Sequence, residues 1–191
     1  MCIRDSSTKL CVEVYKEGQV YFQSYHIGKP DEPVKVIGTC DSEKHGTKVT
    51  FHPDPEIFEE TVYDYDTLKQ RLRETAFLTK GLRIVLTDTR EESHHCHEFH
   101  YAGGIKEFVT YLNRSKEALY PDVIYCEGTR DGVYVEVAMQ HNDSYNDATY
   151  SFVNNIITPE GGTHLAGFRN ALTKTFNTCL LYTSPSPRDY A

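Results

Sequence analysis

Residues 65–88 have the sequence YDTLKQRLRETAFLTKGLRIVLTD, which changes from a helical to a strand pattern at its glycine. Apolar residues recur at helical spacing in residues 65–80, which predicts a helix with one apolar face. That face consists of Leu68, Leu72, Ala76 and Phe77. Gly81 can end the helix, and the apolar residues of 82–88 predict a strand directly after it. A helix followed at once by a strand indicates a mixed α+β fold.

Upstream of this helix, several segments alternate apolar and polar residues. The segments are residues 9–16, 19–27, 34–40 and 47–52. Such alternation predicts antiparallel strands, each with one buried face. Glu17-Gly18 is a tight-turn pair between the first two strands, so we expect these to form a hairpin. Pro53 and Pro55 end the region, because proline cannot continue the interior of a sheet.

Downstream, a second group of elements follows Gly103-Gly104. The expected elements are a short strand at 99–101, a helix at 105–113, strands at 122–127, 132–140 and 149–157, and a helix from Thr163. The last helix has an apolar face made of Leu165, Phe168, Ala171, Leu172 and Phe176. Asp131-Gly132 predicts a hairpin between two of the strands. We therefore expect an α+β chain in two units, divided near residue 102.

The composition is that of a folded, acidic protein. The chain has 191 residues, 39% of them hydrophobic, with 20 Lys and Arg against 28 Asp and Glu. The net charge of −8 argues against nucleic-acid binding over the whole surface. No stretch approaches the roughly 20 apolar residues of a membrane helix, and the start, MCIRDSSTKL, lacks the apolar core of a signal peptide. The six cysteines form no Cys-x-x-Cys pair, so we expect reduced thiols in a cytoplasmic protein.

The two ends differ in pattern from the rest of the chain. Residues 1–6 show neither a helical nor a strand period, and residues 178–191 are rich in Ser and Pro after a well-patterned helix. Both ends resemble translated sequencing-adapter sequence, and we expect them to be non-native flanks that take no part in the fold. The alternative is a natural disordered tail. If the ends are flanks, residues 7–177 are an interior part of a longer protein.

Residues 94–100 have the sequence HHCHEFH and are the candidate metal site. Histidine and cysteine are ligands suited to zinc. In a strand, His95 and His97 would share one face with Phe99, and the remaining residues from His94 to His100 would share the other. A structural zinc site usually draws its ligands from two separated pairs, and the chain offers no second pair at that spacing. We interpret the segment as a polar hairpin and keep metal binding as the alternative.

Two glycine-containing segments could approach a ligand. Lys44-His45-Gly46-Thr47 enters a strand, where glycine permits close backbone approach and the threonine hydroxyl can donate and accept hydrogen bonds. Glu160-Gly161-Gly162-Thr163-His164 precedes a helix, but no Walker-type lysine follows in position. Ordinary turn and helix-start chemistry is the simpler interpretation of both. No nucleophile–base pair can be singled out, so the residues alone predict no self-contained active site.

Several blocks of the chain resemble the B subunits of bacterial type IIA DNA topoisomerases, those of DNA gyrase first and of topoisomerase IV second. The blocks are VKVIGTC at 34–40, HGTKVTFHPDPEIF at 45–58, YDTLKQRLRETAFLTKGLRIVLTD at 65–88, FHYAGGIKEFVTYLN at 99–113 and GVYVEVAMQHNDSYNDATYSFVNNIITPEGGTHLAGFRNALTKTFN at 132–177. They occur in order at plausible spacing, and the resemblance covers residues 7–177.

The resemblance implies an α+β fold with two named parts. Residues 7–101 would be the C-terminal part of a GHKL ATPase α/β sandwich, and residues 102–177 the N-terminal part of a ribosomal protein S5 domain 2-like transducer domain. The implied activity is that of an isomerase which couples ATP hydrolysis, with Mg2+, to DNA strand passage and supercoiling. The implied partners are the DNA gyrase A protein and a second B subunit in an A2B2 enzyme, and double-stranded DNA. The implied location is the cytoplasm, without a membrane.

The resemblance also implies nucleotide contacts for three residues. Thr47 matches the family threonine that helps to hold the adenine, and Gly46 precedes it. Lys16 stands where many members carry an arginine at the mouth of the nucleotide pocket. Lysine keeps the charge but lacks the planar, two-pronged guanidinium, so contacts that need that arginine are not expected here.

The remaining functional residues of the family lie outside this chain. The catalytic glutamate, the magnesium-binding asparagine and the glycine-rich phosphate loops lie upstream, and the transducer lysine that reaches the γ-phosphate lies downstream of Asn177. The resemblance therefore implies no catalytic residue and no metal ligand here, and little nucleotide affinity for the chain alone. A stand-alone binding module with a metal site at 94–100 is the alternative from a different functional class.

Overall fold

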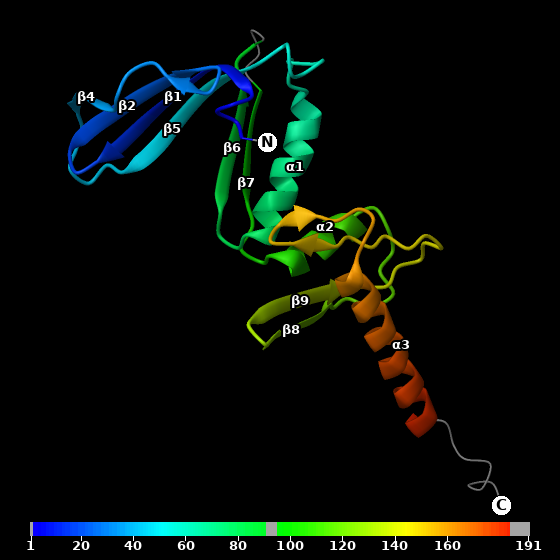
Figure 1. The fold of residues 1–191 in the computed structure, drawn as a ribbon. Coiled ribbons are helices and arrows are strands. Elements are labelled where there is room, and N and C mark those ends of the chain that lie inside the picture. The colour runs from blue at the N-terminus through cyan, green and yellow to red at the C-terminus, as the bar shows by residue number, and fades with distance from the viewer. Residues whose placement is uncertain (1, 91–94, 184–191) are drawn as a thin grey trace, which may run out of the picture. The chain divides into compact units, whose positions relative to one another are not determined.

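The computed structural model describes residues 2–90 and 95–183, and its contacts divide the chain into two compact units between Asp64 and Tyr65. Figure 1 shows the order of the elements along the chain. The boundary differs from the predicted division near residue 102. The reason is that the helix at 65–80 buries its apolar face against elements on both sides of residue 102, so it cannot separate from either.

The first unit is an antiparallel sheet. Its strands are β1 (Ser7–Lys16), β2 (Gln19–His26), β3 (Lys29–Pro30), β4 (Lys35–Thr39) and β5 (Gly46–Pro53). Strand β1 lies between β2 and β5, and both β3 and β4 pair with β2. Glu17 and Gly18 join β1 to β2 with φ angles of 53° and 74°, so the predicted hairpin and its turn are confirmed.

The burial predicted for this sheet is only partly right. Leu10 and Val20 are buried, but every residue of β4 is exposed, and Val36 and Val49 are 50% and 48% exposed. The described residues of this unit form a single sheet without a helix, so no second layer within the unit covers these exposed apolar residues. Sequence alternation identifies the apolar face of a strand, but it does not supply the layer that buries that face.

Residues 2–6, which were expected to take no part in the fold, pack against the start of this sheet. The Ser7 hydroxyl donates to the Ile3 carbonyl at 2.6 Å, and the Asp54 amide donates to the Ser6 carbonyl at 3.1 Å. Ser6 and Ser7 are both buried. These contacts make the segment part of the folded unit, although it has no helical or strand period. Met1 lies outside the described residues.

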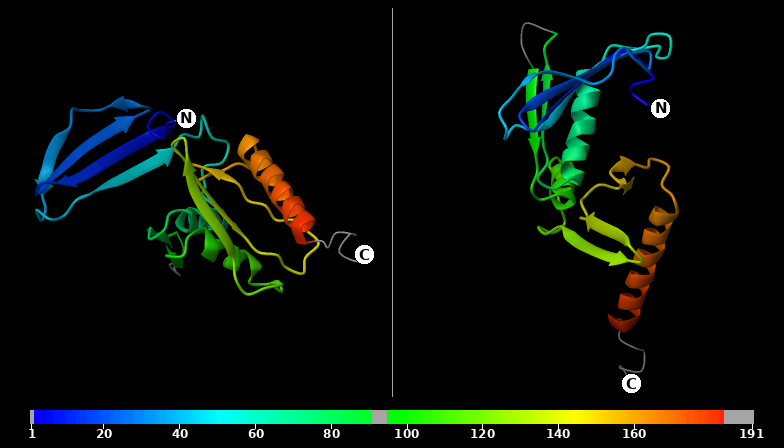
Figure 2. Two further views of the ribbon diagram at one scale, coloured as in Figure 1. Left: turned by 90° about the horizontal axis from the view of Figure 1, so that it is seen from below. Right: turned by 60° about the vertical axis from the view of Figure 1, so that its left-hand side comes forward.

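The second unit combines helices with short hairpins. Its elements are α1 (Tyr65–Leu78), β6 (Arg83–Asp88), β7 (His95–His100), α2 (Ile105–Asn113), β8 (Ile124–Arg130), β9 (Val133–Met139), β10 (Phe152–Val153), β11 (Ile156–Ile157) and α3 (Thr163–Thr183). Helix α1 lies along the β6–β7 hairpin in both views (Figure 1, Figure 2). The helices at 65–80 and 105–113 and the hairpin across Asp131-Gly132 are confirmed.

The core of the second unit is aromatic. Phe77 and Phe99 are 1% and 0% exposed, and Ala76 is fully buried beside them. The Phe77 ring stacks on Tyr101 with 3.6 Å between centroids and lies 5.0 Å from the ring of Phe108. These contacts join α1, the end of β7 and α2, so the predicted apolar face of α1 forms the centre of the unit.

Three predictions about the second unit need correction. Strand β7 begins at His95 rather than at 99, because it pairs with the whole of β6. The strand expected at 149–157 is the short β10–β11 hairpin, because Asn154 and Asn155 adopt φ angles of 49° and 65° and reverse the chain. Helix α3 runs to Thr183, beyond the expected end at Asn177.

The apolar face predicted for α3 is present in the sequence but is not buried. Leu165, Phe168 and Leu172 are partly exposed, and Phe176 is 50% exposed. Within residues 2–90 and 95–183, every helix is too short or too polar to cross a lipid bilayer.

Candidate functional site

The structure brings the predicted nucleotide-contacting residues to one end of the first sheet. In the register of β1 and β5, Tyr15 pairs with Gly46 and Val14 pairs with Thr47. Lys16 follows Tyr15 at the last position of β1. Residues that are about 30 positions apart in sequence therefore become neighbours through strand pairing alone.

Lys16 and Thr47 also share a face of this sheet. Side chains alternate along a strand, so Lys16 and Val14 point to the same side, and Thr47 lies directly opposite Val14. Both side chains are exposed. The Lys16 ammonium lies 3.4 Å from a carboxylate oxygen of Glu17, but both groups are largely in water, where such a pair contributes little.

Gly46 has a backbone conformation that explains its residue type. Its φ angle is +154°, which side chains of L-residues rarely adopt, and nothing lies within 4 Å of the position a Cβ would occupy. Conformation rather than crowding therefore requires glycine at the entry to β5. The open space also leaves the backbone accessible to a ligand.

The opposite face of the same strands carries a cluster that sequence reasoning missed. Lys48 lies 3.0 Å from a carboxylate oxygen of Glu13, the Tyr15 hydroxyl donates to Glu13 at 2.9 Å, and the Lys44 ammonium lies 4.2 Å from the centre of the Tyr15 ring. The hydrogen bonds from Lys48 and Tyr15 lower the pKa of Glu13. No local signal marks these partners, because Glu13 and Lys48 are 35 residues apart and meet only through the register.

The histidine-rich strand packs as part of the second unit. The His97 ring lies 4.5 Å from buried Phe99, and the His95 ring lies 5.7 Å from Tyr65. Glu98 forms an ion pair with Arg83 at 2.7 Å. In the part of the chain that the structure describes, no group of three or more His, Cys, Asp or Glu side chains could hold a metal ion. His94 lies outside the described residues.

The glycine pair before α3, Gly161-Gly162, packs against residues of its own segment. Gly161 has a φ angle of +72°, and a Cβ there would lie 2.9 Å from a methyl group of Leu165. The His164 ring lies 3.2 Å from the Thr158 hydroxyl. These contacts match the interpretation of this segment as an ordinary helix start.

A cleft of about 380 Å³ lies between α1 and α2. Phe108 and Tyr111 form its aromatic side, and Arg73 lies over the Tyr111 ring at 5.0 Å. Glu74, which is mostly buried, accepts from Gln70 and forms an ion pair with Arg71. Arg73 thus contacts α2, whereas Glu74 is paired within α1.

Comparison with known proteins finds similar sequences. The model of the family described as DNA gyrase B matches residues 104–183. The DNA gyrase B protein of Clostridium acetobutylicum is 58% identical over 167 residues, which are 87% of this chain and 26% of that protein. The gyrase B protein of Halalkalibacterium halodurans is 54% identical over 172 residues, 90% of this chain and 26% of that protein. The chain is similar to DNA gyrase B proteins over most of its length.

Solved gyrase B structures have the same fold. The 43K ATPase domain of Thermus thermophilus gyrase B, solved with an aminocoumarin, matches 96% of this chain and 51% of that chain with a TM-score of 0.81 and 33% identity. The gyrase B protein of Myxococcus xanthus matches 87% of this chain and 48% of that chain with a TM-score of 0.79 and 26% identity. The α+β fold is confirmed, and gyrase B is favoured over topoisomerase IV. The chain spans about a quarter of the length of the first two of these relatives.

Proposed function

We propose that the chain is a segment of the ATPase subunit of DNA gyrase, the type II topoisomerase that couples ATP hydrolysis to DNA strand passage and supercoiling. The observation that carries the proposal is the 58% identity to a gyrase B protein over 87% of the chain. Within the whole protein, residues 7–101 would end the GHKL ATPase domain and residues 102–177 would begin the transducer domain. A family match that starts at residue 104 supports this division.

The role proposed for the first sheet is to complete one side of the nucleotide site. Thr47 would help to hold the adenine, Gly46 would let the backbone approach it, and Lys16 would supply positive charge at the mouth of the site. The support is that Lys16 and Thr47 share one face at one end of β1 and β5, with open space at Gly46. Thr47 offers a hydroxyl that can both donate and accept.

The whole protein would use ATP and Mg2+ and would act in the cytoplasm on double-stranded DNA. Its protein partners would be the DNA gyrase A protein and a second B subunit in an A2B2 enzyme. The residues proposed here bind and position the nucleotide, while the catalytic groups would come from other parts of the protein. We therefore expect the 191-residue chain alone to hydrolyse no ATP above background.

The test is a chimera in which residues 7–177 replace the matching segment of the Clostridium acetobutylicum gyrase B protein. The chimera is assembled with the gyrase A protein and assayed for ATP hydrolysis and supercoiling. We expect both activities, and an inactive but folded chimera would speak against the proposed function.

The site residues are tested in the same chimera. Thr47→Ala should raise the KM for ATP about tenfold, because losing a hydrogen bond to the ligand costs about 1–2 kcal/mol. Thr50→Ala is the matched control, because Thr50 lies on the same strand but on the opposite face. Equal KM values for the two variants would contradict the role proposed for Thr47.

A further inference from the structure

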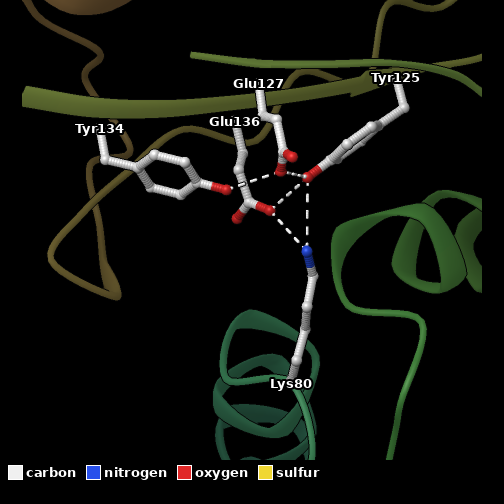
Figure 3. Close-up of polar contacts among 5 residues, drawn as sticks. All are labelled: Lys80, Tyr125, Glu127, Tyr134 and Glu136. Carbon is white, nitrogen blue, oxygen red and sulfur yellow. Dashed lines mark hydrogen bonds and ion pairs between the residues drawn. The ribbon is translucent and has the colours of Figure 1, made fainter. Parts of the chain in front are cut away.

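A polar network joins the end of α1 to the β8–β9 hairpin (Figure 3). The Lys80 ammonium lies 2.8 Å from Glu136 and 3.4 Å from the hydroxyl of Tyr125. The Tyr125 hydroxyl is within hydrogen-bond distance of both Glu127 and Glu136. Tyr134 donates to Glu127 at 2.8 Å. A phenol has one proton, so Tyr125 can donate a hydrogen bond to only one of the two carboxylates at a time. The positive charge of the Lys80 ammonium compensates the negative charge of Glu136.

The β8–β9 hairpin contains two carboxylates that repel each other, and Lys80 reduces this repulsion. Glu127 and Glu136 are direct partners in the register of β8 and β9. Like charges directly opposite each other on neighbouring strands destabilise the pairing. The cation that contacts this pair, Lys80, comes from outside the hairpin because it follows α1. Lys106, on α2, lies 4.5 Å from the centre of the Tyr125 ring. The charge of Glu136 is therefore balanced when the end of α1 is in place.

The conformation of the Lys80 side chain depends on the absence of a side chain at Gly104. A Cβ at Gly104 would lie 2.5 Å from Lys80 Cε and 2.8 Å from Lys80 Cγ, so the side chain crosses the backbone of this glycine closely. The Gly81 amide, next in the chain, donates to the Tyr101 carbonyl at 3.1 Å. These two contacts hold the end of α1 against the start of α2 and direct the lysine toward β9.

We propose that Lys80 is a positioning residue that couples the part of the protein before Gly104 to the β8–β9 hairpin within the gyrase B family segment. The inference rests on the proposed function. Lys80 lies before the matched segment 104–183 and Glu136 lies inside it, so the ion pair joins the two parts. A displacement of α1 withdraws the ammonium and leaves Glu127 and Glu136 facing each other.

The contact itself is tested in the 191-residue chain by amide hydrogen exchange. Lys80→Gln removes the charge, Lys80→Arg keeps it, and Lys69→Gln, on the helix that precedes Lys80, is the matched control. We expect Lys80→Gln to speed exchange of the β8–β9 amides about threefold or more relative to those of β1 and β2. The other two variants should match the unchanged chain. Equal exchange in all four proteins would overturn the proposed contact.

The coupling is tested in the gyrase chimera described above. We expect Lys80→Gln to keep the rate of ATP hydrolysis while supercoiling per ATP falls about fivefold or more, with recovery in Lys80→Arg. A parallel loss of both activities indicates a merely structural role, and no loss indicates no role, so either result overturns the inference. Inactivity of the unsubstituted chimera bears on the proposed function instead, and the exchange experiment then still decides whether Lys80 holds the hairpin.

Discussion

Glu127 and Glu136 stand directly opposite each other on β8 and β9, and the Lys80 ammonium lies 2.8 Å from the second of them. The repulsion between the two carboxylates and the attraction to the lysine therefore act on the same pair of strands. A hairpin built in this way depends on a cation from another element. Removing one of the carboxylates should reduce that dependence.

The first prediction concerns this dependence. Glu127→Gln removes the repulsion but keeps a side chain of nearly the same shape. Lys80→Gln should speed β8–β9 amide exchange in both backgrounds. We expect the effect in the Glu127→Gln background to be less than half of the effect in the unchanged chain, because Lys80 and the two carboxylates interact. The measurement is a double-mutant cycle of exchange rates. Strictly additive effects would show that the lysine and the carboxylate pair act independently.

The second prediction concerns pH. Hydrogen bonds from Tyr125 and Tyr134 lower the pKa of Glu127 from its usual 4.5. Burial acts to raise the pKa of Glu136, but its polar neighbours, with the hydrogen bond from Lys80 first, outweigh burial, so this pKa also lies below 4.5. A carboxylate whose pKa is lowered by folding stabilises the folded state fully above its unfolded pKa and loses this effect as the pH falls through the folded pKa.

The hairpin should consequently loosen at acidic pH. The groups that contact the two carboxylates are Lys80, Tyr125 and Tyr134, and hydrogen bonds to the carboxylates raise the pKa of each, so all three keep their protons between pH 7 and pH 3. Lys106 contacts the Tyr125 ring. We expect protection of the β8–β9 amides, corrected for intrinsic exchange, to be constant above about pH 5 and to fall below it. The Glu127→Gln, Glu136→Gln double variant should lack this step. A step of the same size in the double variant would assign it to other carboxylates.

The third prediction concerns Gly104. Its φ angle is +63°, and a Cβ would meet the Lys80 side chain at 2.5 Å. Gly104→Ala should therefore lower the free energy of unfolding by about 1–2 kcal/mol through backbone strain and should displace Lys80 from Glu136. Chemical denaturation and the exchange rates of β8–β9 measure the two effects. Gly128→Ala on β8 is the control, because nothing lies within 4 Å of a Cβ there. Comparable losses of unfolding free energy in the two variants would argue against the close passage of the Lys80 side chain over Gly104.

Local sequence patterns predicted most of the elements but not their burial. The spacing of Leu68, Ala76 and Phe77 located α1, and Glu17-Gly18 located the first hairpin. Both depend on interactions between residues close in sequence. The exposure of β4 and of Phe176 depends on which layer lies over each face, and alternation along a strand or helix carries no such information.

The candidate site was predictable only in part and for the same reason. Family resemblance pointed to Lys16, Gly46 and Thr47, and the register of β1 and β5 explains why they are neighbours. The Lys80–Glu136 pair escaped prediction because its members are 56 residues apart and meet through three-dimensional packing. Gly103-Gly104 was noticed as a boundary between groups of elements, and the structure adds that the Lys80 side chain passes close to Gly104.

The fourth prediction tests whether Phe77 is the centre of the second unit. Its ring is 1% exposed and contacts the rings of Tyr101 and Phe108. Phe77→Ala should destabilise this unit by about 3–5 kcal/mol, because it removes a fully buried ring and leaves a cavity. Phe176→Ala is the matched control, because this ring is 50% exposed, and it should cost less than about 1 kcal/mol.

The measurement for Phe77→Ala must separate the two units. Amide exchange in denaturant reports on each set of strands individually, so the β6–β7 amides follow the second unit and the β1–β2 amides follow the first. We expect Phe77→Ala to destabilise β6–β7 selectively, since the ring contacts only elements of its own unit among the described residues. Equal destabilisation of β1–β2 would show that the two units unfold as one, and the boundary between Asp64 and Tyr65 would then not be a boundary of cooperative folding.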